Sequence, residues 1–434
     1  PLADPASGRA CAAPVEIHGS VIEALDGAPI PGALVVAADE RGTPVTTVVE
    51  TDADGRYVLP VSVRRDAAGE LAEAPRWTLL VSASGYLPFP GALRPALPID
   101  ALEAVPPDDA TGPWIIDDAA TVVALVSLSP AAAGGVTLAG QVEGEHASGT
   151  LVVAEGPPLA PMAVADADGG FVLFNVPAGS VTVRGYRQGV ELEPVEVEVA
   201  DQDVEDLRLS VLTDDPAAMA TVEGSVVLVD AGGGVATSVV LVPTSVYQPA
   251  FERGPVPPGL RAPEPPQAPS ISGRFAIAGV PAGRYHVLAA FENDGLVRDP
   301  DAAIAGTQIQ QIDVAAGAAL ELEASFKVTA ALMVVGPGAD APEEVGPAPT
   351  FAWIDDTSED RYELVVYDAR GTEVWRDPEL PRVTGGGTVE VPYGGPALVS
   401  GMLHQFRVIS WSDGPQGSTA LTRTEDLRGV FVVR

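Results

Sequence analysis

The chain has 434 residues, of which 46 are glycine and 42 are proline, and its formal net charge is -36. The length indicates three or four domains rather than one small core. The glycine and proline content favours short strands joined by turns over helices. The charge argues against nucleic acid as a partner, because phosphate binding needs a basic surface, and it argues equally against an anionic membrane.

The start of the chain, its cysteine and its longest uncharged stretch bear on the cell compartment. Cys11 is the single cysteine, so no disulfide can form within the chain. Pro1 stands in the place of an initiator methionine, from which we expect a processed mature form. Residues 1–14 lack periodicity and are expected to form an extended N-terminal arm. Residues 119–142 are uncharged, but serine, proline and glycine interrupt them, which predicts two strands and a linker and no membrane span.

One stretch, residues 166–186, contains the unit around which the chain is organised. It reads DADGGFVLFNVPAGSVTVRGY: an acidic turn closed by glycine, an alternating strand, a Val-Pro-Ala-Gly turn and a second alternating strand. The acidic turn returns at 51–57, and the strand and Val-Pro-Ala-Gly turn return at 273–285. We therefore predict three copies of one β-sandwich unit, with glycine, an aromatic residue and the turn as its constant features.

The first copy has the fullest set of motifs. They are Gly-Ser-Val at 19–21, PIPGALV at 29–35, TDADGRY at 51–57 and Gly-Tyr at 85–86. This run resembles the carboxypeptidase regulatory-like domain, a small transthyretin-like β-sandwich. The resemblance implies that fold, and it implies no activity.

The resemblance divides most of the chain into domains, with insertions that the family pattern lacks. We expect domains at 15–130, 136–213 and 218–332. Insertions interrupt the first domain at 64–76 and 88–120, and a proline-rich insertion interrupts the third at 247–270. The 88–120 insertion is interpreted either as a surface flap around Trp114 or as an interaction loop. The proline-rich segment is interpreted as an extended, solvated spacer, with a docking arm as the alternative.

A different pattern begins near residue 345. Residues 345–434 resemble a fibronectin type III-like sandwich, with Trp353 and Tyr362 as expected core aromatics. The last strand, expected at 427–433, must be paired in its own sheet or donated to a neighbour. The predicted fold class is therefore all-β, with tandem Ig-like and transthyretin-like sandwiches in an elongated array.

Searches for catalytic motifs find none. The four histidines, His18, His146, His286 and His404, fall one per expected domain and lack a glutamate at zinc-site spacing. There is no Gly-x-Ser-x-Gly elbow, and the only lysine, Lys327, lies outside any phosphate-binding loop. We therefore expect no enzyme activity, no catalytic residue and no cofactor-binding residue.

Calcium is the one cofactor with a candidate site. Asp52 with Asp54, and Asp166 with Asp168, place paired carboxylates on a turn, and residues 355–360 form a third acidic cluster. Aspartate also favours such turns because its side chain accepts hydrogen bonds from nearby amides. The third copy has Ser-Ile-Ser-Gly at 270–273 in place of the acidic turn. The turn interpretation is therefore preferred, and no metal ligand is assigned.

Together these features predict an acidic, modular, non-catalytic protein that is secreted by a bacterium or placed on its surface. Its role would be structural, filament-forming or adhesive, through protein partners or self-association at strand edges and insertions. The alternative is an accessory protein that binds glycan or peptide through loops around Trp77, Trp114 or Trp411. The array is expected to be a folding scaffold, with function in the insertions and ends.

Overall fold

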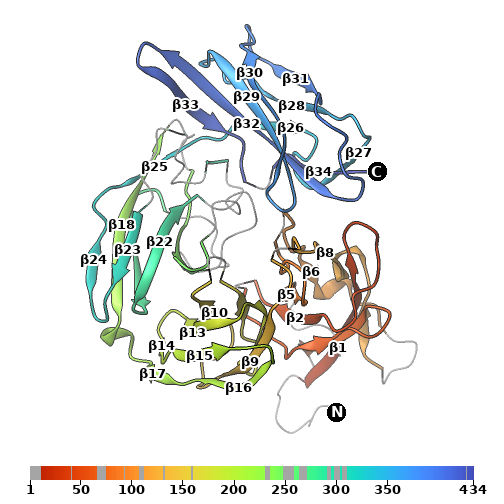
Figure 1. Ribbon diagram of the computed structural model, residues 1–434, viewed down its shortest axis with the longest axis vertical. Helices are drawn as coiled ribbons and strands as arrows, with labels where there is room; N and C mark the ends of the chain where they lie inside the picture. Colours follow the sequence, from red (N-terminus) through yellow and green to blue (C-terminus); the bar gives the residue numbers. More distant parts are fainter. Residues whose placement is uncertain are drawn as a thin grey trace. The chain divides into compact units, whose positions relative to one another are not determined.

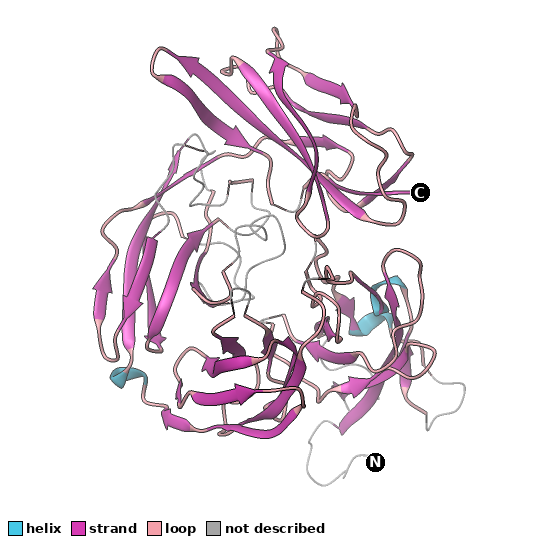
Figure 2. Cartoon of the chain, viewed as in Figure 1, coloured by secondary structure: helices cyan, strands magenta, loops and turns pink. Residues whose placement is uncertain are grey.

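A computed structural model describes residues 11–40, 42–65, 75–91, 93–106, 112–130, 132–157, 160–229, 235–247, 259–262, 271–290, 295–297, 304, 310–426 and 428–434. These residues form 34 β-strands and three single-turn 3-10 helices, so the described part of the chain is all-β (Figures 1 and 2). No helix in this part is long and apolar enough to cross a membrane. The expected residues 1–10 of the arm, most of the 64–76 insertion and most of the 247–270 insertion lie outside the described residues.

The chain divides into two compact units. The first comprises Pro1–Pro90, Ala96–Gly185 and Glu193–Ser210, and the second comprises Gly91–Pro95, Tyr186–Leu192 and Val211–Arg434. Four β-sandwich modules follow one another along the sequence, and we number them 1 to 4. Sheets of the first two modules belong mainly to the first unit, and modules 3 and 4 belong to the second.

Modules 1, 2 and 3 share most of one topology. In each, one sheet places the first strand between the fourth strand, which runs antiparallel to it, and the last strands, which run parallel. The other sheet has the order third, second, fifth, sixth in modules 1 and 3. In module 2 the seventh strand, Val195–Val199, takes the last place, and the sixth, Glu191–Leu192, pairs with Val211–Thr213 instead. The expected insertions are not all outside the sheets. Residues 99–100 and 114–116 of the 88–120 stretch, and residues 260–262 of the 247–270 stretch, are strands of these sheets.

Module 1 contains two of the three single-turn helices among the described residues. Its elements are β1 (Cys11–Glu23), β2 (Leu34–Ala38), β3 (Val49–Glu50), β4 (Arg56–Arg65), β5 (Arg76–Ser82), β6 (Ile99–Asp100), η1 (Ala101–Glu103), β7 (Trp114–Ile116), η2 (Ala119–Thr121) and β8 (Val122–Leu125). The strand β1 pairs with β4 along its whole first part, from Cys11 opposite Arg65 to Ser20 opposite Arg56. Residues 11–14 of the expected arm are therefore part of a sheet.

Module 2 is the most compact copy. Its strands are β9 (Val136–Val142), β10 (Leu151–Glu155), β11 (Met162–Val164), β12 (Gly170–Val176), β13 (Gly179–Tyr186), β14 (Glu191–Leu192), β15 (Val195–Val199), β16 (Val204–Leu209) and β17 (Val211–Thr213). The strands β8 and β9 with their intervening linker account for the uncharged stretch at 119–142.

Module 3 begins after a single-turn helix, η3 (Pro216–Ala218). Its strands are β18 (Ala220–Val229), β19 (Val239–Pro243), β20 (Leu260–Ala262), β21 (Arg274–Val280), β22 (Gly283–Ala289), β23 (Gln310–Val314), β24 (Ala319–Glu321) and β25 (Phe326–Thr329).

Module 4 has a different strand order. Its strands are β26 (Val334–Gly336), β27 (Glu343–Val345), β28 (Thr350–Ile354), β29 (Arg361–Asp368), β30 (Glu373–Pro381), β31 (Thr388–Pro392), β32 (Leu403–Gly414), β33 (Gly417–Arg423) and β34 (Val430–Val433). One sheet has the order β26-β28-β31, and the other has β27-β34-β32-β29-β30 with β33 on β32. Trp353 and Tyr362 are fully buried between them, as expected. The terminal strand β34 is paired on both sides within its own sheet.

A glycine opposite an aromatic ring sets the register of each repeat. Gly19 faces Tyr57 across the first and fourth strands, Gly140 faces Phe171, and Gly224 faces Phe275. A Cβ built on Gly140 would lie 2.7 Å from the Phe171 ring, and one on Gly224 would lie 2.7 Å from the Phe275 ring. The ring therefore occupies the space that a side chain on the first strand would need. This contact explains why Gly-x-Val and Gly-x-aromatic recur together in the sequence.

We expect Gly140→Ala to destabilise the first unit by roughly 1–3 kcal/mol, the usual cost of overpacking a well-packed core. The new methyl group would meet both Phe171 and the Leu207 backbone, which cannot withdraw without breaking the sheet. Urea denaturation followed by fluorescence or circular dichroism measures the change.

Gly273→Ala is the matched control, because its Cβ would meet nothing within 4 Å. Equal stability of the Gly140 and Gly273 variants would contradict the role given to the glycine.

Candidate functional site

One recurring turn takes part in the contacts between modules 1 and 2 and between modules 2 and 3. It connects the fourth and fifth strands and carries the Val-Pro-Ala-Gly motif at 176–179 and 280–283. The residue before the motif, Asn175 or Gly279, has a left-handed backbone, with φ of 60° and 68°. We call these two segments, 175–179 and 279–283, the docking turns.

In the first unit, the docking turn of module 2 contacts module 1. The Gly85 amide donates a hydrogen bond of 2.9 Å to the Asn175 side-chain oxygen Oδ1. Gly85 belongs to the loop that follows β5, the fifth strand of module 1. Asparagine suits this position because it tolerates the left-handed backbone and also supplies an acceptor.

The acidic turn at the other end of β12 also contacts module 1. The Asp166 oxygen Oδ2 accepts a hydrogen bond of 3.1 Å from the Val48 amide, and the Ala167 amide donates to the Thr46 carbonyl at 3.0 Å. The Ser148 hydroxyl donates to the Pro44 carbonyl at 2.8 Å. The turns at both ends of β12, in module 2, therefore contact module 1.

The second unit repeats the arrangement with other side chains. The Gly189 amide donates to the Gly279 carbonyl at 2.7 Å, and the Gln188 side chain donates to the Ala278 carbonyl at 2.9 Å. The Ala282 amide of the docking turn donates to Glu191 Oε2 at 2.8 Å. A Cβ on Gly279 would lie 2.9 Å from the Gly189 nitrogen, so this close approach requires glycine.

The loop after the fifth strand is used a third time, between modules 3 and 4. The Gly295 amide donates to Glu425 Oε1 at 2.6 Å, and the Gly295 carbonyl accepts from the Ala331 amide at 2.8 Å. Leu332 pairs with Thr424 in a parallel bridge. A small apolar cluster of Val297, Ile304, Ala420, Ala331, Ile409 and Trp411 covers these hydrogen bonds.

The acidic turns of modules 1 and 2 are capped by their own backbone. Asp166 is 7% exposed, and its Oδ1 accepts hydrogen bonds from the Asp168 and Gly170 amides at 3.0 and 2.8 Å. Asp52 Oδ1 accepts from the Asp54 and Arg56 amides at 2.9 and 2.8 Å in the same way. These bonds give both aspartates the turn-forming role that the sequence favours over calcium. Within the described ranges, no group of three or more His, Cys, Asp or Glu side chains is arranged to hold a metal ion.

The third acidic cluster, residues 355–360 between β28 and β29, is partly buried. The Tyr362 hydroxyl donates to Asp355 Oδ1 at 2.8 Å and accepts from the Asp356 amide at 2.7 Å, and burial raises the pKa of Tyr362. Asp360 Oδ2 accepts hydrogen bonds from the Ser412 hydroxyl and the Asp413 amide, which lower its pKa. The loop is thus attached to the sheet by its own carboxylates.

Glu359 is the exception in this loop. Its side chain is completely buried, and neither carboxylate oxygen has a hydrogen-bond partner. Burial raises the pKa of Glu359, its own backbone amide lowers it in part, and the nearby carboxylates of Asp355 and Asp356 raise it further. The guanidinium of Arg382, 4.0 Å away, is half-exposed and offsets only part of this cost. No pattern in the sequence distinguishes Glu359 from the solvated acids around it.

The histidines and the lysine do not come together. His286 lies against the Tyr247 ring and His404 against the Phe431 ring, and burial lowers the pKa of both histidines. His18 contacts Glu16 in module 1, and Lys327 is exposed on β25. The fourth histidine, His146, is exposed.

The tryptophans proposed for glycan binding contribute to packing. Trp77 is 4% exposed in the core of module 1, and Trp114 packs partly buried against that core. Trp411 packs in the apolar cluster between modules 3 and 4, beneath the guanidinium of Arg361, whose central carbon is 5.0 Å from the ring centroid.

Comparisons with known proteins do not place the chain in a family. No family model matches it, and no curated protein matches it. Among solved structures, the Bacillus anthracis TIE protein is 10% identical with a TM-score of 0.16, and the match covers 93% of this chain and 68% of that one. The shaft pilin SpaA of Lactobacillus rhamnosus GG is 8% identical with a TM-score of 0.18, covering 47% and 99%. The minor pilin GBS52 of Streptococcus agalactiae is 11% identical with a TM-score of 0.19, covering 48% and 99%. Identities and TM-scores this low do not assign the chain to any of these groups.

We expect Asn175→Gly to expose the Gly85 amide to solvent, raising its hydrogen-exchange rate up to about tenfold, as the loss of one hydrogen bond implies. Glycine keeps the left-handed backbone, so the effect isolates the side-chain acceptor. Exchange monitored by mass spectrometry measures it.

The Gly189 amide is the internal control for this variant, because it donates to a backbone carbonyl. Unchanged exchange at Gly85, or an equal rise at Gly189, would contradict the contact.

We expect Glu359→Gln to stabilise the protein at pH 7 by roughly 1–3 kcal/mol, because glutamine keeps the shape of the side chain but removes a buried negative charge that lies beside two other carboxylates. A raised pKa in the folded state means that stability falls as pH rises above the unfolded value. The advantage of glutamine should therefore shrink toward zero below about pH 4, where glutamate is protonated in both states.

Thermal denaturation between pH 3 and pH 8 tests this, with Glu379→Gln as the control. The Glu379 side chain is 75% exposed, so its replacement should change little at any pH. A Glu359 variant no more stable than the native chain at pH 7 would contradict the proposed cost.

Proposed function

We propose that this chain is a non-catalytic, modular protein of a bacterial surface or its surroundings, acting as a structural, filament-forming or adhesion component. The observation that carries the proposal is the repeated use of the loop after the fifth strand to join one module to the next. Gly85, Gly189 and Gly295 each donate a backbone hydrogen bond there. Such joints suit a spacer that holds contact surfaces at set distances.

The chemistry of these joints supports that role. Most of the donors and acceptors are backbone groups, so the joints depend on turn geometry more than on side-chain identity. Isolated interfaces between domains of one chain commonly permit relative motion. Each joint here has several hydrogen bonds, and the joint between modules 3 and 4 also has an apolar cluster. These contacts favour a fixed arrangement of neighbouring modules within each unit.

The strand edges indicate how self-association would occur. The terminal strand β34 lies between β27 and β32, so within this structure it is not available for donation to a neighbour. Edge strands such as β4, β26 and β31 keep one side open to pairing among the described strands. Addition of a strand at such an edge is a common mode of protein association.

The net charge sets the conditions for that association. A charge of -36 opposes close contact between copies at low salt, and screening by salt reduces the repulsion. We therefore expect oligomers or filaments to form as the salt concentration rises from about 0.05 to 1 M, which spans Debye lengths from above 10 Å to about 3 Å. Light scattering after size exclusion, followed by negative-stain microscopy, measures the assembly.

A chain that stays monomeric at every salt and protein concentration would overturn the filament-forming role. Material purified from its native source should be included, because it carries any partner or modification that assembly needs.

A further inference from the structure

One face of module 4 exposes large apolar side chains where a two-layer sandwich usually presents polar ones. Along β28, Phe351 and Trp353 point into the core and are fully buried, so Ala352 and Ile354 lie on the outer face. The adjacent segment, which contains β26, adds Met333, which is 67% exposed, and Val335, which is 45% exposed. The Ile354 amide donates to the Met333 carbonyl, which places these two residues side by side.

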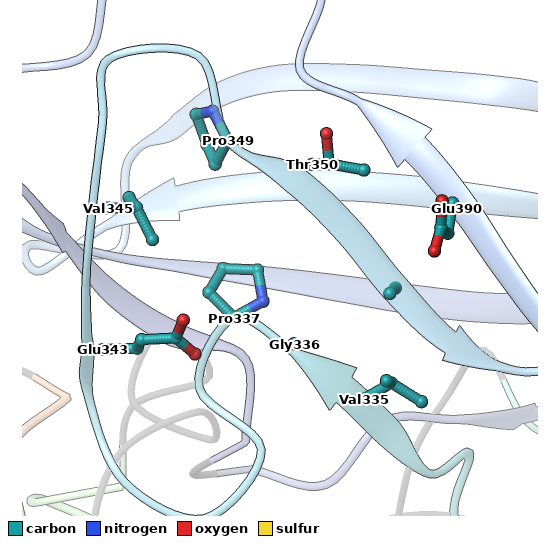
Figure 3. Close-up of a pocket in the computed structure, with 9 residues that line it drawn as sticks. Val335, Gly336, Pro337, Glu343, Val345, Pro349, Thr350 and Glu390 are labelled. Atoms are coloured by element: carbon teal, nitrogen blue, oxygen red, sulfur yellow. The ribbon is translucent and has the colours of Figure 1, made fainter.

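A hollow of about 390 Å³ lies on this face. Figure 3 shows Val335 on β26, Pro337 directly after that strand, and Thr350 at the start of β28. The strand β27, with Glu343 and Val345, forms one side of the hollow, and Glu390 lies on the opposite side. We call this hollow, together with Met333 and Ile354, the β26 groove.

The rim of the β26 groove is acidic. Glu343 accepts a hydrogen bond from the Gly338 amide at 3.0 Å, which holds its carboxylate at the edge of the hollow. Glu390 is exposed on β31. A hollow lined by valine, proline and threonine between two carboxylates complements a ligand that has both apolar groups and positive charge.

The strand beside the groove is open to pairing. Among the described strands, β26 pairs with β28 alone and stands at the edge of the sheet order β26-β28-β31. An extended peptide can add to such an edge through its backbone while its alternate side chains enter a neighbouring hollow.

We propose that the β26 groove binds an extended segment of a protein partner that alternates apolar residues with lysine or arginine. A second copy of this chain fits poorly, because it has 60 acidic residues against 24 basic ones. The partner is therefore a different, basic protein. This inference goes beyond the proposed function, since it holds whether or not the chain assembles with itself.

The test uses the full chain and three synthetic hexapeptides, blocked at both ends: Lys-Val repeated three times, Glu-Val repeated three times and Lys-Ser repeated three times. Isothermal titration calorimetry should detect binding of the Lys-Val peptide alone. Rising salt should weaken that binding, because the carboxylates of the rim contribute to it.

Substitutions then locate the site. Val335→Ser combined with Met333→Ser should lower the affinity for the Lys-Val peptide about tenfold or more, as the loss of apolar burial by two side chains implies. Glu390→Gln should weaken binding two- to fivefold and reduce its dependence on salt.

Val58→Ser is the matched control, because Val58 is 49% exposed on the outer face of β4. The Val58→Ser variant should bind the Lys-Val peptide with the affinity of the native chain. Equal binding of the Lys-Ser peptide, an absence of Lys-Val binding, or equal losses in the Val58 and Val335/Met333 variants would each overturn the proposal.

Discussion

The contact between a glycine and an aromatic ring on the neighbouring strand is the constraint on which the three repeats depend. Gly19, Gly140 and Gly224 leave the space that Tyr57, Phe171 and Phe275 fill. Because side chains alternate between the faces of a strand, this one pair fixes the register of the whole fourth strand. In module 2 both turns at the ends of that strand contact module 1, and in module 3 the turn that follows it contacts residues 188–191 of module 2.

The joints between modules share a backbone conformation but differ in the groups that form their hydrogen bonds. Asn175 offers a side-chain oxygen to a glycine amide, whereas Gly279 offers its own carbonyl to another. Both residues have the same left-handed backbone, which aims the following Val-Pro-Ala-Gly turn at the preceding loop. A protein built this way can change the surface of each module while the connections persist, which suits a carrier of varied contact surfaces such as the β26 groove.

The repeats, their strands and the all-β class follow from the sequence, because alternation, Asp-Gly turns and Val-Pro-Ala-Gly are local signals. The burial of Trp353 and Tyr362 follows for the same reason. Other features depend on residues far apart in sequence. Glu359 looks like its solvated neighbours until the sheets close over it, and the second oxygen of Asp166 finds Val48 only after two modules meet. The contacts that the Val-Pro-Ala-Gly turn makes with the preceding module likewise depend on residues far apart in sequence.

Asp166 serves two modules with one carboxylate, since Oδ1 shapes its own turn and Oδ2 receives an amide of module 1. If that turn loses its structure, the Val48 amide of module 1 loses its acceptor in module 2. Neighbouring modules linked in this way gain stability from each other, as in repeat proteins whose stability is a sum of unit and interface terms. Modules 1 and 2 should therefore lose their structure cooperatively, and a mechanical or chemical stress on one would be shared by both.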